Sequence, residues 1–415
     1  MLFAAIAAGL WPLNSLYSIG YMRGNDEKHQ TRFYVCFAIA IASALGVAFA
    51  GNLLTLFICY EALTLSTYPL VTHKGNADAV RAGRIYLGLL LTTSIGLLLP
   101  AIVWTYFVAG TVDFRPGGIL AGNLDTGTAG ILLALFLFGI GKAALMPFHR
   151  WLPSAMVAPT PVSALLHAVA VVKAGVFTVL KVVVYIFGVD YLHGSDGSFW
   201  LTVVAAFTLL TASIIAITKD NLKARLAYST VSQLAYVVLG AALATATGVL
   251  GGAFQIAMHA MGKITLFFCA GAIYTAAHKT EISQMDGLGR TMPLTYIAFF
   301  LGALSIIGLP PFGGAWSKWY LMLGAADAEQ TFAIVVLMMS SLLSLGYLIP
   351  IVARGFFLAP PGGFKGIAEA PWFCLVPLMI TATGCIILFF AANNLYQLLE
   401  PIIQTSIDEN LSHGN

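Results

Sequence analysis

The composition of this 415-residue chain excludes an ordinary soluble protein, because 59% of its residues are hydrophobic, only 9% are charged and the mean hydropathy is +0.90. Soluble domains carry about 25% charged residues. The five cysteines lie in apolar runs without a Cys-x-x-Cys pair, which argues against an iron–sulfur, zinc or disulfide framework. A phosphate-binding loop of the pattern G-x-x-x-x-G-K that ended at Gly141-Lys142 would need a glycine five residues before Gly141, where the chain has Phe136. The sequence therefore predicts no nucleotide site. We therefore expect no cofactor, no metal and no nucleic-acid partner.

Apolar segments of the ~20 residues that a spanning helix needs recur from end to end with short loops. They predict an all-α polytopic membrane bundle of about 12 transmembrane helices, with no separate soluble domain. The segments are 2–20, 33–50, 52–72, 82–110, 128–146, 159–187, 198–217, 226–244, 246–277, 292–318, 330–353 and 371–395.

The 20 lysines and arginines support this topology, because loops on the cytoplasmic side carry the positive excess. With strict alternation of sides, only Arg115 falls on the opposite face. The positive face receives Arg23, Lys28, Arg32, Lys74, Arg81, Arg84, Arg150, Lys219, Lys223, Arg225, Lys279, Arg290, Arg354 and Lys365. We expect a bacterial-type inner (plasma) membrane protein with both termini on the outer side.

Five lysines remain inside or at the break of a segment: Lys142, Lys173, Lys181, Lys263 and Lys318. Two of them stand in matching surroundings, since Lys142 is followed by Pro147-Phe148 and Trp151, and Lys318 is preceded by Pro311-Phe312 and Trp316. Interrupted helices at corresponding places in two halves indicate a structural repeat with a site at mid-membrane.

We therefore divide the chain into four regions. They are an N-terminal helix and loop (1–32), a first inverted repeat (33–187), a second inverted repeat (198–353) and a C-terminal helix with tail (354–415).

Glu61 is the only acid deep within any segment, and we expect Lys142 to be its partner. Charged side chains inside a membrane are costly and usually mark an ion or proton path. A buried lysine keeps its proton while a carboxylate pairs with it and releases it when the pair opens. Such a lysine is a switch. The alternative is a static ion pair that fixes helix packing.

Two histidines accompany the central lysines. His259 and Lys263 are four residues apart and share a helix face, so a protonated lysine would keep the imidazole neutral and able to pass a proton. His167 and Lys173 are six apart and do not share a face. A lone histidine in an apolar helix is more often a packing residue, so a packing role stays open for His167 and His259. Lys181, near a helix end, is expected to extend to the interface, outside the path.

Several motifs together resemble the antiporter-like subunits of respiratory complex I, membrane-bound hydrogenases and Mrp-type multisubunit cation/proton antiporters. The motifs are Lys142 through Trp151-Leu-Pro153, Ala158-Pro-Thr-Pro-Val-Ser-Ala-Leu-Leu-His167, Leu222-Lys-Ala-Arg-Leu-Ala-Tyr-Ser-Thr-Val-Ser-Gln233, His259-Ala-Met-Gly-Lys263 and Gly308-Leu-Pro-Pro-Phe-Gly-Gly-Ala-Trp-Ser-Lys318. The resemblance implies two inverted five-helix repeats with broken helices. It also implies a proton path formed by Glu61, Lys142, His167, Lys173, His259, Lys263 and Lys318.

The sequence departs from the family pattern in several places. Two helices that usually begin the family's chains have no counterpart, and whether another subunit supplies them is open. Ser154 replaces the acid of Trp-Leu-Pro-Asp, Trp319 stands where an acid often follows the lysine, and Gln255 replaces a helical histidine.

We predict a proton-translocating membrane subunit of a larger complex, with cation/proton antiport left open. It has no catalytic centre of its own, and the other membrane subunits and the lipid bilayer are its partners. Protons are the cargo, and whether sodium also crosses is open. The drive would come from a redox partner or a counter-ion gradient. The alternatives are a stand-alone secondary transporter of a small solute and a non-conducting structural subunit.

Overall fold

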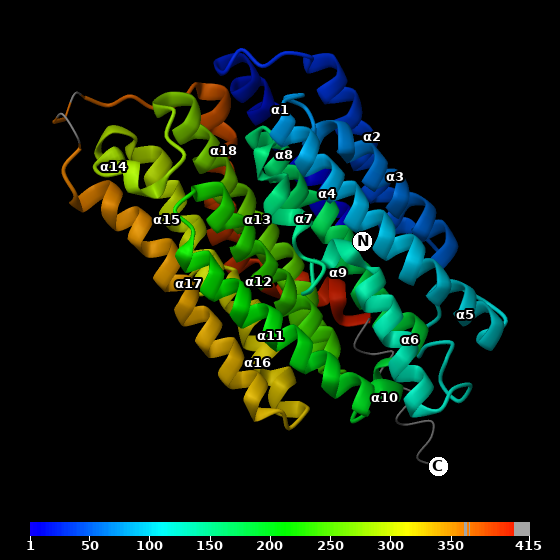
Figure 1. Cartoon of the computed structure of the whole chain (residues 1–415). Coiled ribbons are helices and arrows are strands. Elements are labelled where there is room, and N and C mark those ends of the chain that lie inside the picture. Colours follow the sequence, from blue (N-terminus) through cyan, green and yellow to red (C-terminus); the bar gives the residue numbers. More distant parts are fainter. Residues whose placement is uncertain (361–362, 365, 402–415) are drawn as a thin grey trace.

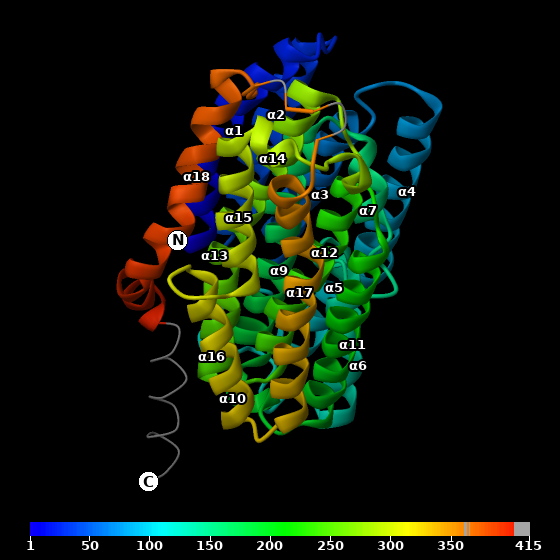
Figure 2. The same cartoon turned by 90° about the vertical axis from the view of Figure 1, so that its left-hand side faces the viewer.

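A computed structural model describes residues 1–360, 363–364 and 366–401 of the chain, and these residues are almost entirely helical, with no β-strand among them. Lys365 and the tail after Pro401, both assigned above to the C-terminal region, lie outside the described residues. The helices run side by side in one bundle (Figures 1 and 2). The predicted all-α membrane fold is confirmed.

The first half of the bundle contains one broken helix, formed by α6 and α7, and two long helices with π-helical segments. Its elements are α1 (Leu2–Gly24), α2 (Gln30–Phe49), α3 (Leu53–Val71), α4 (Ala77–Thr93) with α5 (Leu99–Ala109), α6 (Thr126–Gly139) with α7 (Trp151–Ser154), α8 (Thr160–Ala164) with α9 (Val171–Val182), and the short α10 (Val189–Leu192). A π-helical segment, Ser94–Leu98, joins α4 to α5, and another, Leu165–Val169, follows α8.

The second half contains one broken helix and the most deeply buried helix. Its elements are α11 (Asp196–Thr218), α12 (Leu222–Ala242), α13 (Ala246–Ala277), α14 (Leu288–Thr291), α15 (Pro293–Ile307) with α16 (Gly314–Asp327), α17 (Thr331–Phe357) and α18 (Trp372–Phe390). In α13, 94% of the most apolar 18-residue window is buried inside the bundle.

Nine helices in the described part of the chain are long and apolar enough to cross a membrane. Two other predicted segments are divided at breaks, where α6 and α15 count as shorter apolar helices. The remaining one, α12, begins with Lys223 and Arg225 and carries polar residues at Ser229–Gln233. The count of about twelve therefore stays a prediction.

Side-chain caps fix where several helices begin. Asn52 and Asn221 each accept a hydrogen bond from the backbone N–H three residues later, at the starts of α3 and α12. Such caps satisfy N–H groups that have no partner within the helix. The same two residues form isolated antiparallel bridges, Asn52 with Asp113 and Asn221 with Glu281. The start of α3 is thus tied to the residues that follow α5, and the start of α12 is tied to the residues that follow α13.

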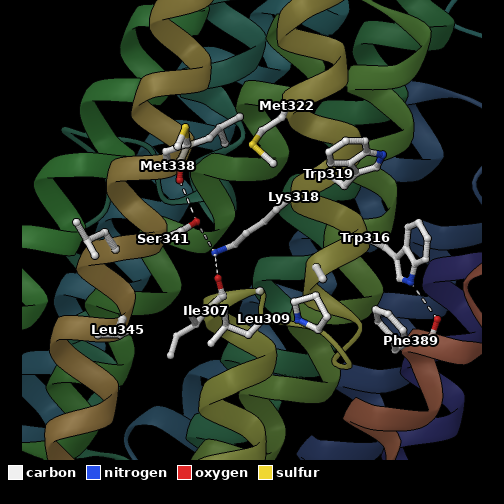
Figure 3. Close-up of a pocket in the computed structure, with 15 residues that line it drawn as sticks. Ile307, Leu309, Trp316, Lys318, Trp319, Met322, Met338, Ser341, Leu345 and Phe389 are labelled. Carbon is white, nitrogen blue, oxygen red and sulfur yellow. Dashed lines mark hydrogen bonds between the residues drawn. The ribbon is translucent and has the colours of Figure 1, made fainter.

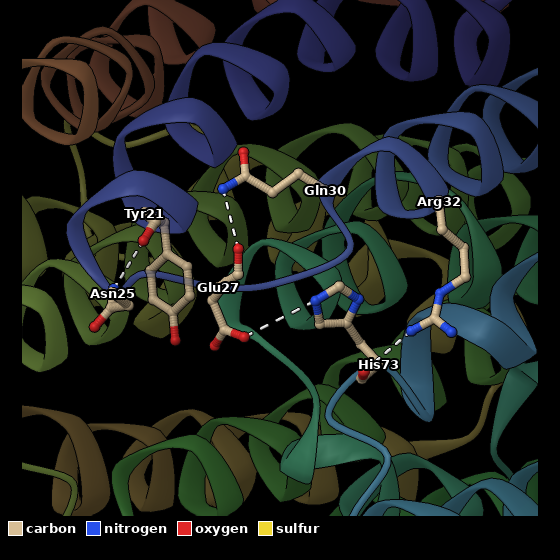
Figure 4. Close-up of polar contacts among 6 residues, drawn as sticks. All are labelled: Tyr21, Asn25, Glu27, Gln30, Arg32 and His73. Atoms are coloured by element: carbon tan, nitrogen blue, oxygen red, sulfur yellow. Dashed lines mark hydrogen bonds and ion pairs between the residues drawn. The ribbon is translucent and has the colours of Figure 1, made fainter.

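The connection between α1 and α2 lies at the same end of the bundle as α14 and the connection from α17 to α18 (Figure 2). Polar contacts hold this connection in place (Figure 4): Arg32 donates to the carbonyl oxygen of His73 at 3.1 Å, and the His73 ring lies 3.9 Å from the Glu27 carboxylate. Arg32, which was predicted on the positive face, therefore lies at this connection.

Candidate functional site

The buried amino groups and imidazoles are the most unusual feature of the interior. Lys142, Lys173 and Lys263 are 0% exposed and Lys318 is 6% exposed. His167 and His259 are equally buried. A charged group in such surroundings is stable only with hydrogen-bond partners. The partners of each therefore show what the site can do.

The first break holds Lys142 against α3. The α6 helix ends at Gly139, and Lys142 lies in a short 3₁₀ turn, Gly141–Ala143. Its amino group donates to the Tyr60 carbonyl oxygen at 2.9 Å and to Thr64 Oγ1 at 2.5 Å. It also lies 3.2 Å from the centre of the Tyr60 ring, a cation–π contact. Neutral groups thus surround the ammonium.

Glu61 does not form the direct ion pair with Lys142 that the sequence suggested. Both Glu61 carboxylate oxygens are buried and have no hydrogen-bond partner among the described residues. The reason is helical geometry: Tyr60 and Thr64, four residues apart, share a face of α3, whereas the next residue points about 100° away. The amino group of Lys142 is therefore hydrogen-bonded to Tyr60 and Thr64 of α3, whereas Glu61 of the same helix acts on it only electrostatically.

At the centre of the bundle, the Lys173 amino group lies 2.5 Å from His259 Nδ1, which links α9 to α13. When Lys173 is protonated, Nδ1 accepts this hydrogen bond and the neutral ring carries its proton on Nε2. His259 Nε2 has no partner in the described part of the chain. The imidazole is therefore hydrogen-bonded to a lysine of the other half and not to Lys263 on its own helix.

Lys263 turns toward α12. Its amino group donates to Ser229 Oγ at 2.6 Å and to the Leu226 carbonyl oxygen at 3.3 Å. His167 interacts electrostatically with Lys263. Both ring nitrogens of His167 are buried and have no hydrogen-bond partner among the residues described. Buried polar atoms of this kind usually bind ordered water.

The second break positions Lys318 (Figure 3). Its amino group donates to the Ile307 carbonyl oxygen at 2.6 Å and to Ser341 Oγ at 2.9 Å. A cavity of about 640 Å³ adjoins this lysine and is lined mainly by apolar side chains, among them Trp319, Met338 and Leu342. Trp319, at the position where the family often has an acid, is 51% exposed.

Tryptophans stabilise both breaks. Trp151 Nε1 donates to the Gly141 carbonyl oxygen at 2.9 Å, next to Lys142. Trp316 Nε1 donates to the Phe389 carbonyl oxygen at 3.0 Å, on α18. At the first break the indole N–H satisfies a carbonyl group of the interrupted helix, and at the second it satisfies a carbonyl group in the last turn of α18. The tryptophans that marked the two breaks in the sequence therefore have a structural role at each.

Sequence reasoning missed the neutral partners of the lysines: Tyr60, Thr64, Ser229, Ser341 and, beyond them, Tyr347. Hydroxyl residues three or four apart in an apolar segment were the available signal, as in Ser340-Ser-Leu-Leu-Ser344-Leu-Gly-Tyr347.

Gln255, which replaces a family histidine, donates to Gln233 Oε1 at 2.7 Å and accepts from Ser317 at 2.6 Å. Lys181 is partly exposed and donates to the Ala50 carbonyl oxygen, apart from the other four.

Comparison with known proteins identifies the family. The family described as NADH:quinone oxidoreductase/Mrp antiporter, TM, matches residues 50–344. The chain is 32% identical over 390 residues to NADH-quinone oxidoreductase subunit N of Desulforudis audaxviator, covering 90% of this chain and 77% of that protein. It is 31% identical over 449 residues to a Na(+)/H(+) antiporter subunit of Alkalihalophilus pseudofirmus, covering 100% of this chain and 54% of that protein.

A solved structure, that of the Mrp complex from Dietzia sp. DQ12-45-1b, contains a chain with a TM-score of 0.81 and 25% identity, covering 98% of this chain and 83% of that one. The chain spans about half the length of several curated relatives, for example 54% of NAD(P)H-quinone oxidoreductase chain 5 of Synechocystis. The resemblance inferred from the motifs is confirmed. This multi-pass membrane protein belongs to the family of antiporter-like subunits shared by NADH:quinone oxidoreductases and Mrp antiporters.

Proposed function

We propose that this chain translocates protons as one membrane subunit of a multisubunit complex, along Glu61, Lys142, His167, Lys173, His259, Lys263 and Lys318. The observation that carries the proposal is the set of four buried lysines, each hydrogen-bonded to a neutral group. A lysine that is removed from water and has no carboxylate partner holds its proton less firmly, so it can release the proton to a neighbouring acceptor.

Glu61 completes this proposal as the acid next to the first break. It acts on Lys142 electrostatically without touching it. A small movement of α3 or of the turn at Lys142 would form or break their ion pair. We propose that this change of partner, between the Tyr60–Thr64 face of α3 and Glu61, switches Lys142 between holding and releasing its proton.

The sided distribution of charge and the matched bridges support the rest of the arrangement. We propose two inverted repeats, 33–187 and 198–353, flanked by 1–32 and 354–415. The chain would lie in a bacterial-type inner membrane with its basic loops in the cytoplasm and its termini outside. Moving one charge against 100 mV costs about 2.3 kcal/mol. The partner subunits must therefore supply a drive, either a redox reaction or a sodium gradient.

The deciding experiment replaces Lys142 with methionine in the assembled complex, reconstituted in liposomes that enclose a pH-sensitive dye. One arm is energised with NADH and quinone, and the other with an imposed sodium gradient. Methionine keeps the length of the side chain but removes the titratable amine. We expect proton movement to fall at least about a hundredfold, within the range that a positioned proton-transfer group contributes.

Lys181→Met is the matched control, because Lys181 is also a partly buried lysine of a spanning helix but lies apart from the path. It should transport at nearly the normal rate. If the intact wild-type complex moves no protons in either arm, the proposed function is wrong. Normal transport by the Lys142→Met complex would instead favour a structural role for the buried charges.

A further inference from the structure

The α17 helix carries hydroxyl groups that the path above does not use. Four of them, Ser340, Ser341, Ser344 and Tyr347, lie within eight residues of an otherwise apolar spanning helix. Ser340, Ser344 and Tyr347 are 0% exposed. Residues three and four apart are neighbours on one side of a helix. We call Ser341, Ser344 and Tyr347 the hydroxyl stripe.

One end of the hydroxyl stripe is hydrogen-bonded to Lys263 through a single serine. Lys263 Nζ donates to Ser229 Oγ at 2.6 Å, and Ser229 Oγ lies 2.9 Å from the Tyr347 hydroxyl. The Tyr347 hydroxyl lies 3.0 Å from Ser344 Oγ. Three consecutive contacts therefore connect the Lys263 ammonium on α13 with the middle of α17.

The hydrogens along these contacts have one consistent direction. Each hydroxyl has a single hydrogen to donate. Ser344 donates its hydrogen to the Ser340 carbonyl oxygen at 2.9 Å, so it accepts from Tyr347. Tyr347 then accepts from Ser229, which itself accepts from Lys263. Every donor points away from Lys263, as a chain of groups that passes a proton outward requires.

The other end of the hydroxyl stripe is bound to the second broken-helix lysine. Lys318 Nζ donates to Ser341 Oγ at 2.9 Å, and Ser341 donates to the Leu337 carbonyl oxygen at 3.0 Å. Ser341 and Ser344 are three residues apart, with their Cβ atoms about 5–6 Å from each other in a helix. One bridging water spans such a gap at little energetic cost.

We propose that the hydroxyl stripe conducts protons between Lys263 and Lys318, with Ser229 as its link to Lys263 and one water between Ser344 and Ser341. The inference rests on the proposed function and specifies one stretch of its path. The Lys263 ammonium gives its proton to Ser229, whose own hydrogen passes to Tyr347. The Tyr347 hydrogen passes to Ser344, and the Ser344 hydrogen passes to the water.

The water then gives one hydrogen to Ser341 Oγ, and the Ser341 hydrogen passes to the neutral amino group of Lys318. For these last steps, Ser344 and Ser341 rotate away from the carbonyl oxygens of Ser340 and Leu337. One proton leaves Lys263 and one arrives at Lys318, so no other group changes its charge. The hydroxyls must rotate back before the next transfer.

The competing explanation is that these hydroxyls only stabilise helix packing, since serines in spanning helices often bond to the carbonyl four residues earlier. The test is Tyr347→Phe in the assembled, reconstituted complex. This change removes one oxygen atom from a fully buried ring. Tyr296→Phe is the matched control, because Tyr296 is also fully buried and its hydroxyl has no partner among the described residues.

Three further variants keep the test decisive if the Tyr347 variant fails to assemble. Ser344→Ala removes a hydroxyl of the stripe, Ser344→Thr retains it, and Ser340→Ala removes a buried hydroxyl outside the stripe. We expect Tyr347→Phe and Ser344→Ala to slow proton movement at least about tenfold. Ser344→Thr, Ser340→Ala and Tyr296→Phe should remain near the wild-type rate, with equal amounts of assembled complex.

Normal rates for Tyr347→Phe, or for Ser344→Ala where the tyrosine variant does not assemble, would overturn the inference. If the stripe variants are normal while Lys142→Met is inactive, only this stretch of the path is wrong. If the wild-type complex moves no protons, the proposed function fails and this inference fails with it. A normal rate in Ser344→Thr together with a slow rate in Ser344→Ala would exclude a packing role, because alanine is closer in size to serine than threonine is.

Discussion

The two helix breaks use the same residue types but surround their lysines differently. At the first break, Lys142 is 0% exposed and contacts α3 through Tyr60 and Thr64. At the second, Lys318 adjoins a 640 Å³ cavity whose lining includes the 51%-exposed Trp319. One lysine is enclosed by its own chain, and the other lies beside a cavity lined by lipid-facing side chains.

This difference shows that a repeated sequence motif does not fix the surroundings of its lysine. The helix that packs against the break determines these surroundings. Gly175 of α9 lets that helix approach the backbone of Lys142, where any Cβ atom would collide with the Lys142 carbonyl group and the Ala143 nitrogen. At the second break, Lys318 lines the same cavity as apolar side chains of α16 and α17. Lost hydrogen bonds should therefore cost more at the first break than at the second.

Among the substitutions that test this difference between the breaks, the largest effect is expected from Gly175→Ala. Its Cβ atom would meet backbone atoms, which cannot move aside as a flexible side chain can. The turn that holds Lys142 must shift, and overpacking of this kind costs roughly 1–3 kcal/mol or more. We expect at least about a tenfold loss of proton movement in reconstituted complex, together with a lower melting temperature.

Gly88→Ala is the control, since nothing lies within 4 Å of the position its Cβ would take on α4. Alanine is a better helix former than glycine, so this variant should be as stable as the wild type or slightly more stable. Wild-type transport by Gly175→Ala would show that the first break is not closely enclosed.

The fold and most of the site were predictable from the sequence for a physical reason. Spanning helices must be apolar over about 20 residues, so they and the rare charges inside them are visible in the composition. Lys142, Lys173, Lys263 and Lys318 stood out in this way and are all buried. The breaks were visible as Pro-Phe pairs beside tryptophans, because few residue types interrupt an apolar helix.

The partners of the lysines were not predictable in the same way. A serine or threonine costs little in a spanning helix, since it bonds to its own backbone, so Ser229 and Thr64 gave no signal in the hydropathy. Which neighbour Lys142 contacts depends on the rotation of α3, and one residue step separates Glu61 from Tyr60. The pairing of Lys173 with His259 depends on the approach of two helices from different halves. Neither follows from periodicity within one segment.

An intermediate effect is expected from removing one hydroxyl partner at each break. Thr64→Val replaces the partner of the enclosed Lys142, and Ser341→Ala replaces a partner of Lys318 beside the cavity. Hydrogen bonds to charged groups contribute about 1.5–3 kcal/mol. We expect Thr64→Val to lower the melting temperature of the complex more than Ser341→Ala does, in the same detergent. Equal changes, or the reverse order, would contradict the difference between the two breaks.

The smallest effect on stability is expected among the residues predicted on the positive face. Among the described residues, each half has one pair of oppositely chargeable side chains within 4 Å there. Arg354 and Asp286 lie 2.8 Å apart and are partly exposed, whereas His73 lies 3.9 Å from Glu27 with its side chain only 2% exposed. Burial lowers the pKa of His73, and the neighbouring Arg32 lowers it further, so His73 is neutral at pH 7. The His73–Glu27 pair is thus sensitive to pH, and the Arg354–Asp286 pair is not.

The direction of the pH effect follows from proton binding. Since the pKa of His73 in the folded chain lies below the unfolded value of about 6.5, its contribution is constant above that pH. Below it the unfolded chain binds more protons, so stability falls by at most about 1.4 kcal/mol per pH unit. His73→Asn should reduce the loss of melting temperature between about pH 7.5 and 5.5. Asp286→Asn, which removes a surface pair worth under about 1 kcal/mol, should leave that pH dependence unchanged. An unchanged pH dependence in His73→Asn would assign the acid sensitivity to other groups and remove this contrast between the halves.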